Sequence, residues 1–214
     1  AEKYAGTRLD LVIALNTEAL RFATRYRGTF APDVPLIFCC ATRSAVEVEI
    51  ERPPDVTGIV IDYDITRTLQ LAERLQPRAR KLVFISGNSE IDDRWLAMYR
   101  RQLAPLESRF ETTYWTGLSL EEIVARAARL PPDTIVLAGI IFADGSGRQL
   151  VPAEAAEAIA AGSGAPVYAP VDTFLGRGIV GGYMGTFEAA GTEVADLAAE
   201  ILQGADPRGI PPRA

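Results

Sequence analysis

The alternation of strand and helix signals breaks in residues 166–204, which read PVYAPVDTFLGRGIVGGYMGTFEAAGTEVADLAAEILQG. Residues 166–174 are an apolar run with a polar tip, the pattern of a parallel strand covered on both faces. Residues 178–187 form a second short apolar run that is too rich in glycine for a helix. Residues 187–202 then place Ala190, Val194 and Leu197 on one stripe of a long helix that ends near Gly204. A strand followed by another strand predicts a chain crossing between two α/β lobes.

The remainder of the chain alternates between strand and helix signals with short connections. Thr17 and Ser119 are good N-caps for two of the helices, and Asp64 or Thr66 can cap a third. This alternation predicts an α/β protein with parallel sheets. The expected strands cover residues 9–15, 34–40, 58–61, 81–85, 111–114 and 134–138, and the expected helices cover 17–27, 64–75, 91–106, 119–130 and 152–161.

The number of strands predicts how the chain is divided. We expect lobe 1 at residues 1–62 plus 175–214, because the helix at 187–202 returns to the first unit, and lobe 2 at residues 63–174. Lobe 2 has four strands with intervening helices, which make a complete doubly wound unit. Lobe 1 has three strands, too few to cover a sheet well. The proline-rich stretch 207–212 is expected to be an extended linker outside the core.

Composition excludes several classes of function. The 214 residues include 22 basic and 28 acidic side chains, a net charge of -6, which argues against nucleic acid as a partner. No apolar run approaches the roughly 18 residues that a membrane span needs, so any membrane connection is expected from segments outside this chain. The absence of histidine removes the commonest general base and metal ligand. We therefore expect no catalytic residue, no metal and no cofactor, and an enzyme on a doubly wound fold is a remote alternative.

The two cysteines, Cys39 and Cys40, are adjacent at the end of the strand expected at residues 34–40. Successive strand side chains point to opposite faces of a sheet, so the two thiols are expected to face apart. We interpret both as small buried hydrophobic residues, with a strained vicinal disulfide or a reactive thiol as the alternative. Two cysteines do not indicate the redox compartment.

Several motifs occur in an order that resembles a known family. They are Leu75-Gln-Pro77, Asp93-Arg-Trp95, Leu130-Pro-Pro-Asp133 and Phe174-Leu-Gly-Arg-Gly-Ile-Val-Gly-Gly182. Their order resembles the substrate-binding proteins of ABC transporters, and most of all the extracytoplasmic sensor domain fused to bacterial histidine kinases. The resemblance implies two doubly wound parallel-sheet lobes of the type I periplasmic-binding-protein-like fold.

The resemblance also implies a function and a location. The chain is expected to be the small-molecule-binding sensor domain of a two-component histidine kinase, at the periplasmic or extracytoplasmic face of a bacterial inner membrane. A free-standing solute-binding protein of an ABC transporter is the alternative. Members of the family open lobe 1 with two further strands and helices that are absent here. The edge of the strand at residues 9–15 is therefore expected to be uncovered, and we expect association through it, as in a homodimer.

Ligands of the family sit between the carboxyl ends of the strands of both lobes, so residues at strand exits are the expected ligand contacts. Ordinary capping or turn roles are the alternative for each of them. Arg43 and Asp172 would clamp an amino-acid-like or carboxylate-bearing ligand, and Tyr63, Phe142, Phe174 or Tyr183 could stack on a planar group. For Tyr183, packing in the core or at the hinge is the favoured alternative. The expected contacts are Asn16, Thr17, Thr42, Arg43, Ser44, Asp62, Tyr63, Ser86, Asn88, Ser89, Phe142, Asp172, Thr173 and Phe174.

The paired carboxylates have simpler expected roles. Asp92 and Asp93 follow a strand exit at the start of the helix expected at residues 91–106. There they would complement the helix dipole or be solvated.

Overall fold

A computed structural model describes residues 7–214, and the chain divides into two compact units. Unit 1 comprises Ala1–Asp62 and Gly185–Ala214, and unit 2 comprises Tyr63–Met184. The first division falls after Asp62, where the sequence analysis placed it. The second falls before Gly185 and not before Leu175, because the glycine-rich segment preceding Gly185 pairs with unit 2. There, Val180 N donates to Val167 O at 2.8 Å and Ala169 N to Gly181 O at 3.1 Å.

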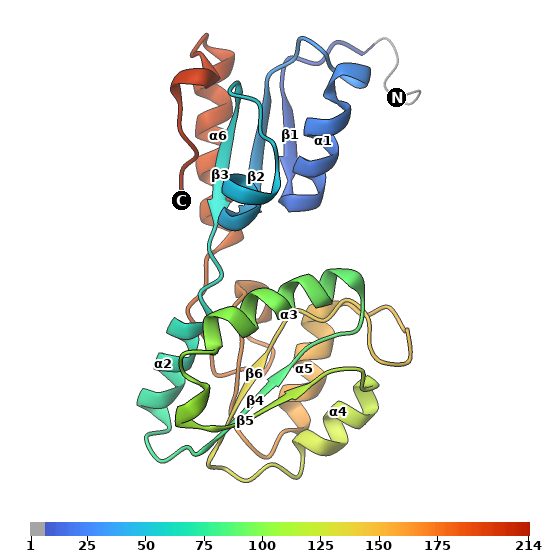
Figure 1. Ribbon diagram of the computed structural model, residues 1–214, viewed down its shortest axis with the longest axis vertical. Helices are drawn as coiled ribbons and strands as arrows, with labels where there is room; N and C mark the ends of the chain where they lie inside the picture. Colours follow the sequence, from blue (N-terminus) through green and yellow to red (C-terminus); the bar gives the residue numbers. More distant parts are fainter. Residues whose placement is uncertain (1–6) are drawn as a thin grey trace. The chain divides into compact units, whose positions relative to one another are not determined.

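Unit 1 is built on a parallel sheet of three strands, β1 (Val12–Leu15), β2 (Leu36–Thr42) and β3 (Val56–Ile61), in the order β1-β2-β3 (Figure 1). Within residues 7–214, β1 pairs with β2 alone. Ile13 and Leu15 of β1 are 42% and 60% exposed. These exposures agree with the expected uncovered edge, whereas association through this edge stays a prediction.

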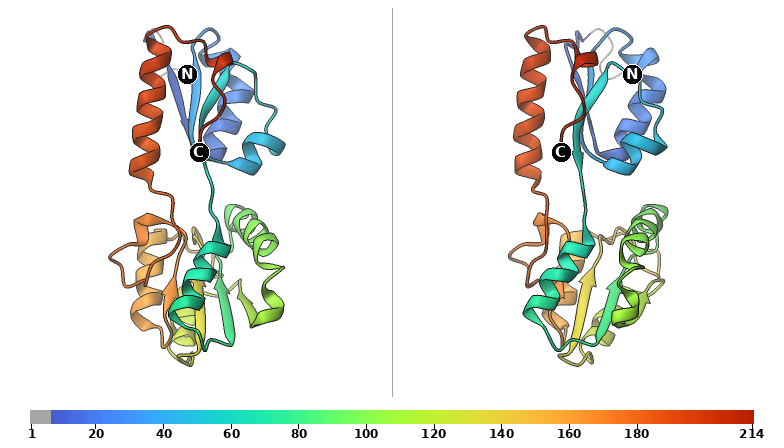
Figure 2. Two further views of the ribbon diagram at one scale, coloured as in Figure 1. Left: turned by 90° about the vertical axis from the view of Figure 1, so that its left-hand side faces the viewer. Right: turned by 60° about the vertical axis from the view of Figure 1, so that its left-hand side comes forward.

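Two helices cover opposite faces of this sheet, α1 (Asn16–Phe30) and α6 (Phe187–Leu202), as Figure 2 shows. Alternation along β2 explains the arrangement: Phe38 belongs to the apolar cluster that includes Leu20 of α1, and Ile37 belongs to the cluster that includes Leu197 of α6. The helix expected at residues 187–202 therefore has the expected bounds, and its packing on unit 1 is confirmed.

The C-terminal segment contradicts the linker prediction. After α6, the short helix η5 (Pro207–Gly209) leads into a segment that pairs with β3. Arg213 N donates to Gly58 O at 2.9 Å, and Val60 N donates to Arg213 O at 2.7 Å. Ile210 packs against the apolar cluster beneath α6. Proline is disfavoured in the interior of helices and strands. The other residues of a proline-rich segment can still form hydrogen bonds with the free backbone groups at a sheet edge.

Unit 2 is a complete doubly wound unit, as predicted. Its parallel strands follow the order β5-β4-β6-β7, with α4 and α5 on the face that carries Val83, Ile85 and Val136. On the other face Phe84 contacts Tyr99 of α3, with ring centroids 5.3 Å apart. The strands are β4 (Lys81–Ile85), β5 (Glu111–Trp115), β6 (Thr134–Ala138) and β7 (Val167–Tyr168), and the helices are α2 (Ile65–Leu75), α3 (Glu90–Leu103), η3 (Glu107–Arg109), α4 (Leu120–Ala127), α5 (Pro152–Gly162) and η4 (Asp172–Phe174).

The second strand expected at residues 178–187 does not form. Only an isolated bridge joins Gly181 to Tyr168 in this segment. A Cβ on Gly182 would lie 1.9 Å from the carbonyl oxygen of Ala169, so the backbone passes there too closely for any side chain. The glycines therefore serve the crossing of the chain between the units.

Candidate functional site

The strand ends of unit 1 bring several expected site residues together. Asn16 follows β1 and Thr42 ends β2, and Thr42 N donates to the hydroxyl of Thr17 at 3.1 Å. Asn16, at a φ of 73°, uses its Oδ1 to accept from Glu18 N and Ala19 N at 3.0 Å each. Asn16, the first residue of α1, thus satisfies two N–H groups of its first turn, and Thr17 joins α1 to β2. These two bonds agree with the capping alternative for Asn16, whereas its contact with a ligand stays a prediction.

Arg43 is paired inside unit 1. Its Nε and Nη2 donate to the same Oδ2 of Asp62 at 3.0 and 2.9 Å, and its Nη1 donates to Glu47 at 3.3 Å. The hydrogen bonds and charge of Asp62, followed by those of Glu47, hold the pKa of Arg43 above its ordinary value. The sequence analysis did not predict these two partners of Arg43, and the expected clamp of a ligand by Arg43 and Asp172 stays a prediction. Two of the five guanidinium N–H donors make no bond to either carboxylate.

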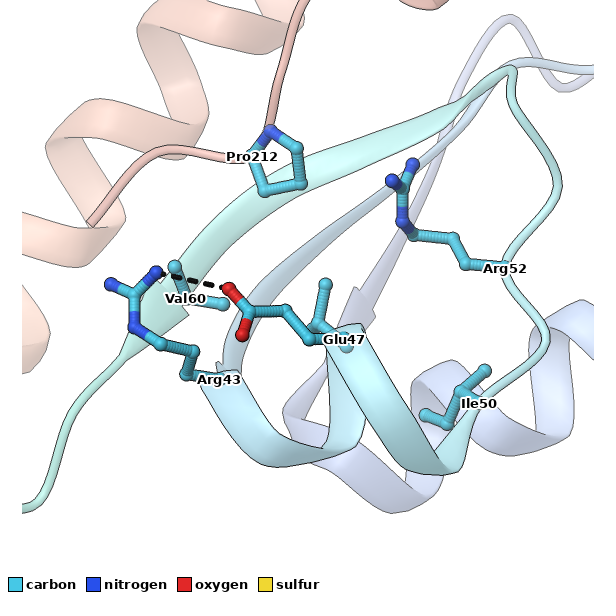
Figure 3. A pocket seen from close by; sticks show the side chains of 7 residues that line it. Arg43, Glu47, Ile50, Arg52, Val60 and Pro212 are labelled. Atoms are coloured by element: carbon cyan, nitrogen blue, oxygen red, sulfur yellow. Dashed lines mark hydrogen bonds and ion pairs between the residues drawn. The ribbon is translucent and has the colours of Figure 1, made fainter.

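A pocket of about 420 Å³ lies beside Arg43 in unit 1 (Figure 3). Val46, Ile50 and Val60 form apolar parts of its wall. Figure 3 shows Arg43 and Arg52 at opposite ends of the view with Glu47 between them, and Pro212 of the C-terminal segment above β3. Val46 and Glu47 lie on η2 (Ala45–Glu49). The hydroxyl of Thr42 accepts from Ala45 N at 3.3 Å, which ties the start of η2 to the end of β2. Ser44 donates to Glu49 at 2.9 Å, so it too supports this turn.

The strand ends of unit 2 are organised by Asp92, whose role the sequence analysis did not predict. This carboxylate is fully buried and accepts hydrogen bonds from Ser89 N at 2.9 Å, Ser89 Oγ at 2.7 Å, Phe142 N at 2.9 Å and Ala143 N at 3.2 Å. It therefore ties the loop after β4 to the loop after β6. Ser89 in turn caps α3. Asn88 is left exposed between them.

Three of the expected contacts in unit 2 are buried in this structure: Ser86, Phe174 and Tyr63. Phe174 is 1% exposed and Ser86 3% exposed, so neither presents a surface to a ligand. Phe174 is buried because η4 turns its ring into the core as the chain leaves β7. Asp172, on the same turn, is partly buried, and Thr173 is exposed.

The aromatic side chains also separate into two groups. Tyr63 is 7% exposed and packs edge-on against Trp95, with ring centroids 4.8 Å apart, so it belongs to the core. Tyr183 is 44% exposed, and the guanidinium carbon of Arg67 lies 4.5 Å from its ring centroid. Tyr183 N donates to the hydroxyl of Thr68 at 3.1 Å, which fixes the crossing segment to α2. Phe142 is partly exposed.

Sequence reasoning missed Asp92, Arg67 and the pocket. The Ser-x-x-Asp spacing of Ser89 and Asp92 is a capping-box signal that could have identified one half of the role of Asp92. In residues 7–214, no three His, Cys, Asp or Glu side chains group as metal ligands. Over the same described stretch, no helix is both long and apolar enough to cross a membrane.

Comparisons with known proteins agree with this architecture. No protein-family profile matches the chain. A tyrosine-binding protein of Clostridioides difficile is 23% identical over 224 residues, a match that covers 99% of this chain. The chain spans 60% of the length of that relative.

Solved structures give the fold. The ABC domain in complex with L-Trp from Streptococcus pneumonia matches with a TM-score of 0.66 and 16% identity, over 99% of this chain and 70% of that one. The ligand-free, open structure of a substrate-binding protein with adhesive properties from Clostridium difficile matches with a TM-score of 0.68 and 17% identity, over the same shares. The chain therefore has the two-sheet α/β fold of periplasmic-binding-protein-like substrate-binding proteins.

Proposed function

We propose that this chain is the ligand-binding part of an extracytoplasmic solute-binding protein, and that its ligand is an aromatic amino acid such as tyrosine or tryptophan. The observation that carries the proposal is the match over 99% of the chain to a protein named for tyrosine binding. The structural match to a domain in complex with L-Trp supports the same class of ligand.

In this proposal, strand-end residues of each unit contribute to binding. In unit 1, the two remaining donors of Arg43 are suited to the carboxylate of an amino acid, and the outward oxygens of Asp62 and Glu47 are suited to its ammonium group. Unit 2 contributes Asn88, a polar side chain exposed at the start of α3. Phe142 and Tyr183, which keep exposed surface, are the candidates to stack on the ring of the ligand.

The same comparisons bear on the sensor hypothesis. The named relatives are binding proteins, and nothing among them is a histidine kinase. They favour the free-standing receptor over the kinase sensor domain as the main proposal. A kinase core encoded in the same gene, downstream of an apolar segment of about 20 residues, would restore the sensor hypothesis.

The test is calorimetry on the full-length protein with L-tyrosine, L-tryptophan and L-phenylalanine, and with L-glutamate and L-lysine as controls. We expect the aromatic ligands to bind and the controls not to. If the folded protein binds none of the aromatic amino acids, the proposal is wrong.

Arg43→Ala tests the contribution of unit 1. Loss of a charge-assisted hydrogen bond costs about 1.5–3 kcal/mol, so we expect affinity to fall roughly 10- to 150-fold. Arg177→Ala is the matched control, because Arg177 also forms an exposed ion pair, at 2.6 Å to Glu157, on the other unit. If both variants bind the ligand as tightly as the parent, Arg43 does not contact the ligand, whereas the proposed function still stands.

A further inference from the structure

The adjacent cysteines lie on the same face of the unit 1 sheet, contrary to the sequence prediction. Along β2, Phe38 and Ala41 belong to the cluster on the α1 side, whereas Cys39 is in the cluster on the α6 side and Cys40 packs against that same cluster. The register explains this, because Cys39 pairs with Ile59 and Ala41 with Val60. Cys40 is therefore the extra residue of a β-bulge, and its φ of 61° turns its side chain to the face of Cys39.

The bulge brings the two sulfur atoms to 3.2 Å. Both are free thiols. The Cys39 thiol donates to the carbonyl oxygen of Ala190 in α6 at 3.6 Å, which leaves its sulfur to accept from the thiol of Cys40. The positive φ of a residue other than glycine costs about 1–2 kcal/mol, so the rest of unit 1 must hold this arrangement in place.

We propose that Cys39 and Cys40 form a vicinal dithiol site that low-molecular-weight disulfides oxidise to a vicinal disulfide. Neither the solute-binding proposal nor its test depends on this site. In the first step, the thiolate of Cys40 attacks a disulfide RSSR, forms the mixed disulfide Cys40–S–SR and releases RS⁻. In the second, Cys39 loses its proton and attacks Sγ of Cys40, and the second RS⁻ leaves. The protein loses two protons and two electrons, and the reagent gains them as two RSH.

Burial decides the order of the two steps. Cys39 is 3% exposed, whereas Cys40 is partly exposed and is the thiol that a reagent in solution can reach. Burial, followed by the contact with Cys40 and the charge of Glu193, raises the pKa of the Cys39 thiol to about 12. Cys39 is therefore protonated at neutral pH and acts second, after the first step has placed its target sulfur beside it.

The first experiment treats the folded protein with oxidised glutathione and counts thiols by mass spectrometry and with a chromogenic disulfide. We expect both free thiols to disappear, the mass to fall by that of two hydrogens, and the species to remain monomeric on a non-reducing gel. Two thiols that persist in the folded protein, or a covalent dimer in place of the internal bond, would overturn the proposal.

The second experiment uses phenylarsine oxide, a trivalent arsenical that two neighbouring thiolates bind together and one thiolate binds weakly. The reduced parent should bind one equivalent, and Cys39→Ser or Cys40→Ser should lose it. Cys39→Ala is the second variant at the buried position, because a small apolar side chain keeps the packing beneath α6 if serine does not. The far-ultraviolet circular dichroism of each variant shows whether it is folded. Arsenical binding retained by a folded single-cysteine variant would contradict the paired site.

Discussion

Asp92 illustrates how much one side chain can organise at a strand end. Asp92 accepts four hydrogen bonds: Oδ2 accepts from the N–H and hydroxyl of Ser89 and from Ala143 N, and Oδ1 accepts from Phe142 N. Hydrogen bonds of this kind offset the cost of burying the charge. Asp92 therefore holds together the loops that carry Asn88 and Phe142. If these loops bind the ligand as proposed, this preorganisation lowers the entropy cost of binding.

Gly87 is the residue that allows this contact. A Cβ at Gly87 would lie 2.3 Å from Oδ2 of Asp92 and 2.6 Å from the carbonyl oxygen of Ala143. We expect Gly87→Ala to lower the free energy of unfolding by about 1–3 kcal/mol, because the backbone must move. Gly191→Ala is the control: no atom lies within 4 Å of its added Cβ in α6, and it should stabilise by about 0.5–1 kcal/mol. Urea unfolding measures both. Equal effects of the two substitutions would contradict the close contact.

Asp144 predicts a pH dependence of stability. Its burial acts to raise the pKa, but hydrogen bonds from the Ser146 hydroxyl and from the backbone N–H groups of Leu120, Arg148 and Ser146 lower it to about 2. A group with a lowered folded-state pKa contributes its full stabilisation above its unfolded pKa of about 4. That contribution is lost as the pH falls towards 2.

Asp144→Asn should therefore be less stable than the parent by about 1–3 kcal/mol at pH 7, because an amide leaves some of these donors unpaired. The difference should shrink as the pH falls from 4 to 2. The control is Asp196→Asn, an exposed position on α6. Denaturant unfolding across this pH range measures the difference, and a constant difference at every pH would show that the Asp144 charge is not involved.

At the scale of elements, α6 completes unit 1 from the far end of the chain. Its buried side chains Ala190, Val194, Leu197 and Ile201 cover Ile37, Cys39 and Ile59 of β2 and β3. The spacing of the four on one helical stripe is visible in the sequence. Which sheet they cover is decided by where the chain returns.

Two leucines of α6 give a matched pair of substitutions. Leu197 is fully buried and Leu202 is 57% exposed. We expect Leu197→Ala to lower the free energy of unfolding by about 2–5 kcal/mol, through lost burial and a residual cavity. Leu202→Ala should change it by less than about 0.5 kcal/mol. Thermal and urea unfolding measure both, and a Leu202 effect as large as that of Leu197 would contradict the orientation of α6.

At the scale of the whole molecule, the two units differ in continuity. Unit 2 is a single stretch, Tyr63–Met184, with its own four-stranded sheet, whereas unit 1 needs Gly185–Ala214 as well as Ala1–Asp62. A domain with a complete core can fold alone.

We therefore expect a fragment of residues 63–184 to unfold cooperatively by circular dichroism. A fragment of residues 1–62 should not, because it lacks α6 and exposes the apolar face of Ile37 and Ile59. Restoring residues 185–214 through a short glycine-serine linker should recover a cooperative transition. Cooperative unfolding of the 1–62 fragment would show that α6 is not needed.

The sequence alone determined the elements whose signals are local. The strands at 81–85 and 134–138 and the helix at 187–202 have the predicted bounds, because apolar periodicity and neighbouring turn or cap residues mark both ends of each. The same local signals predicted two parallel sheets and the return of α6 to the first unit. They also predicted the cap of α4 at Ser119 and left Asp64 and Thr66 as alternatives for α2, where the structure has Asp64.

Only the tertiary structure decided contacts between residues distant in the chain. The C-terminal segment lies along β3 because Gly58 and Val60 at the sheet edge need hydrogen-bond partners, which a proline-rich sequence does not reveal. Cys40 turns to the face of Cys39 because it is an extra residue of β2 that has no partner in β3. Arg43 binds Asp62 because the end of β3 lies beside the end of β2. Phe174 is buried because it lies on the turn η4. Local periodicity reports which face of an element is apolar, whereas pairing, register and burial depend on what packs against that face.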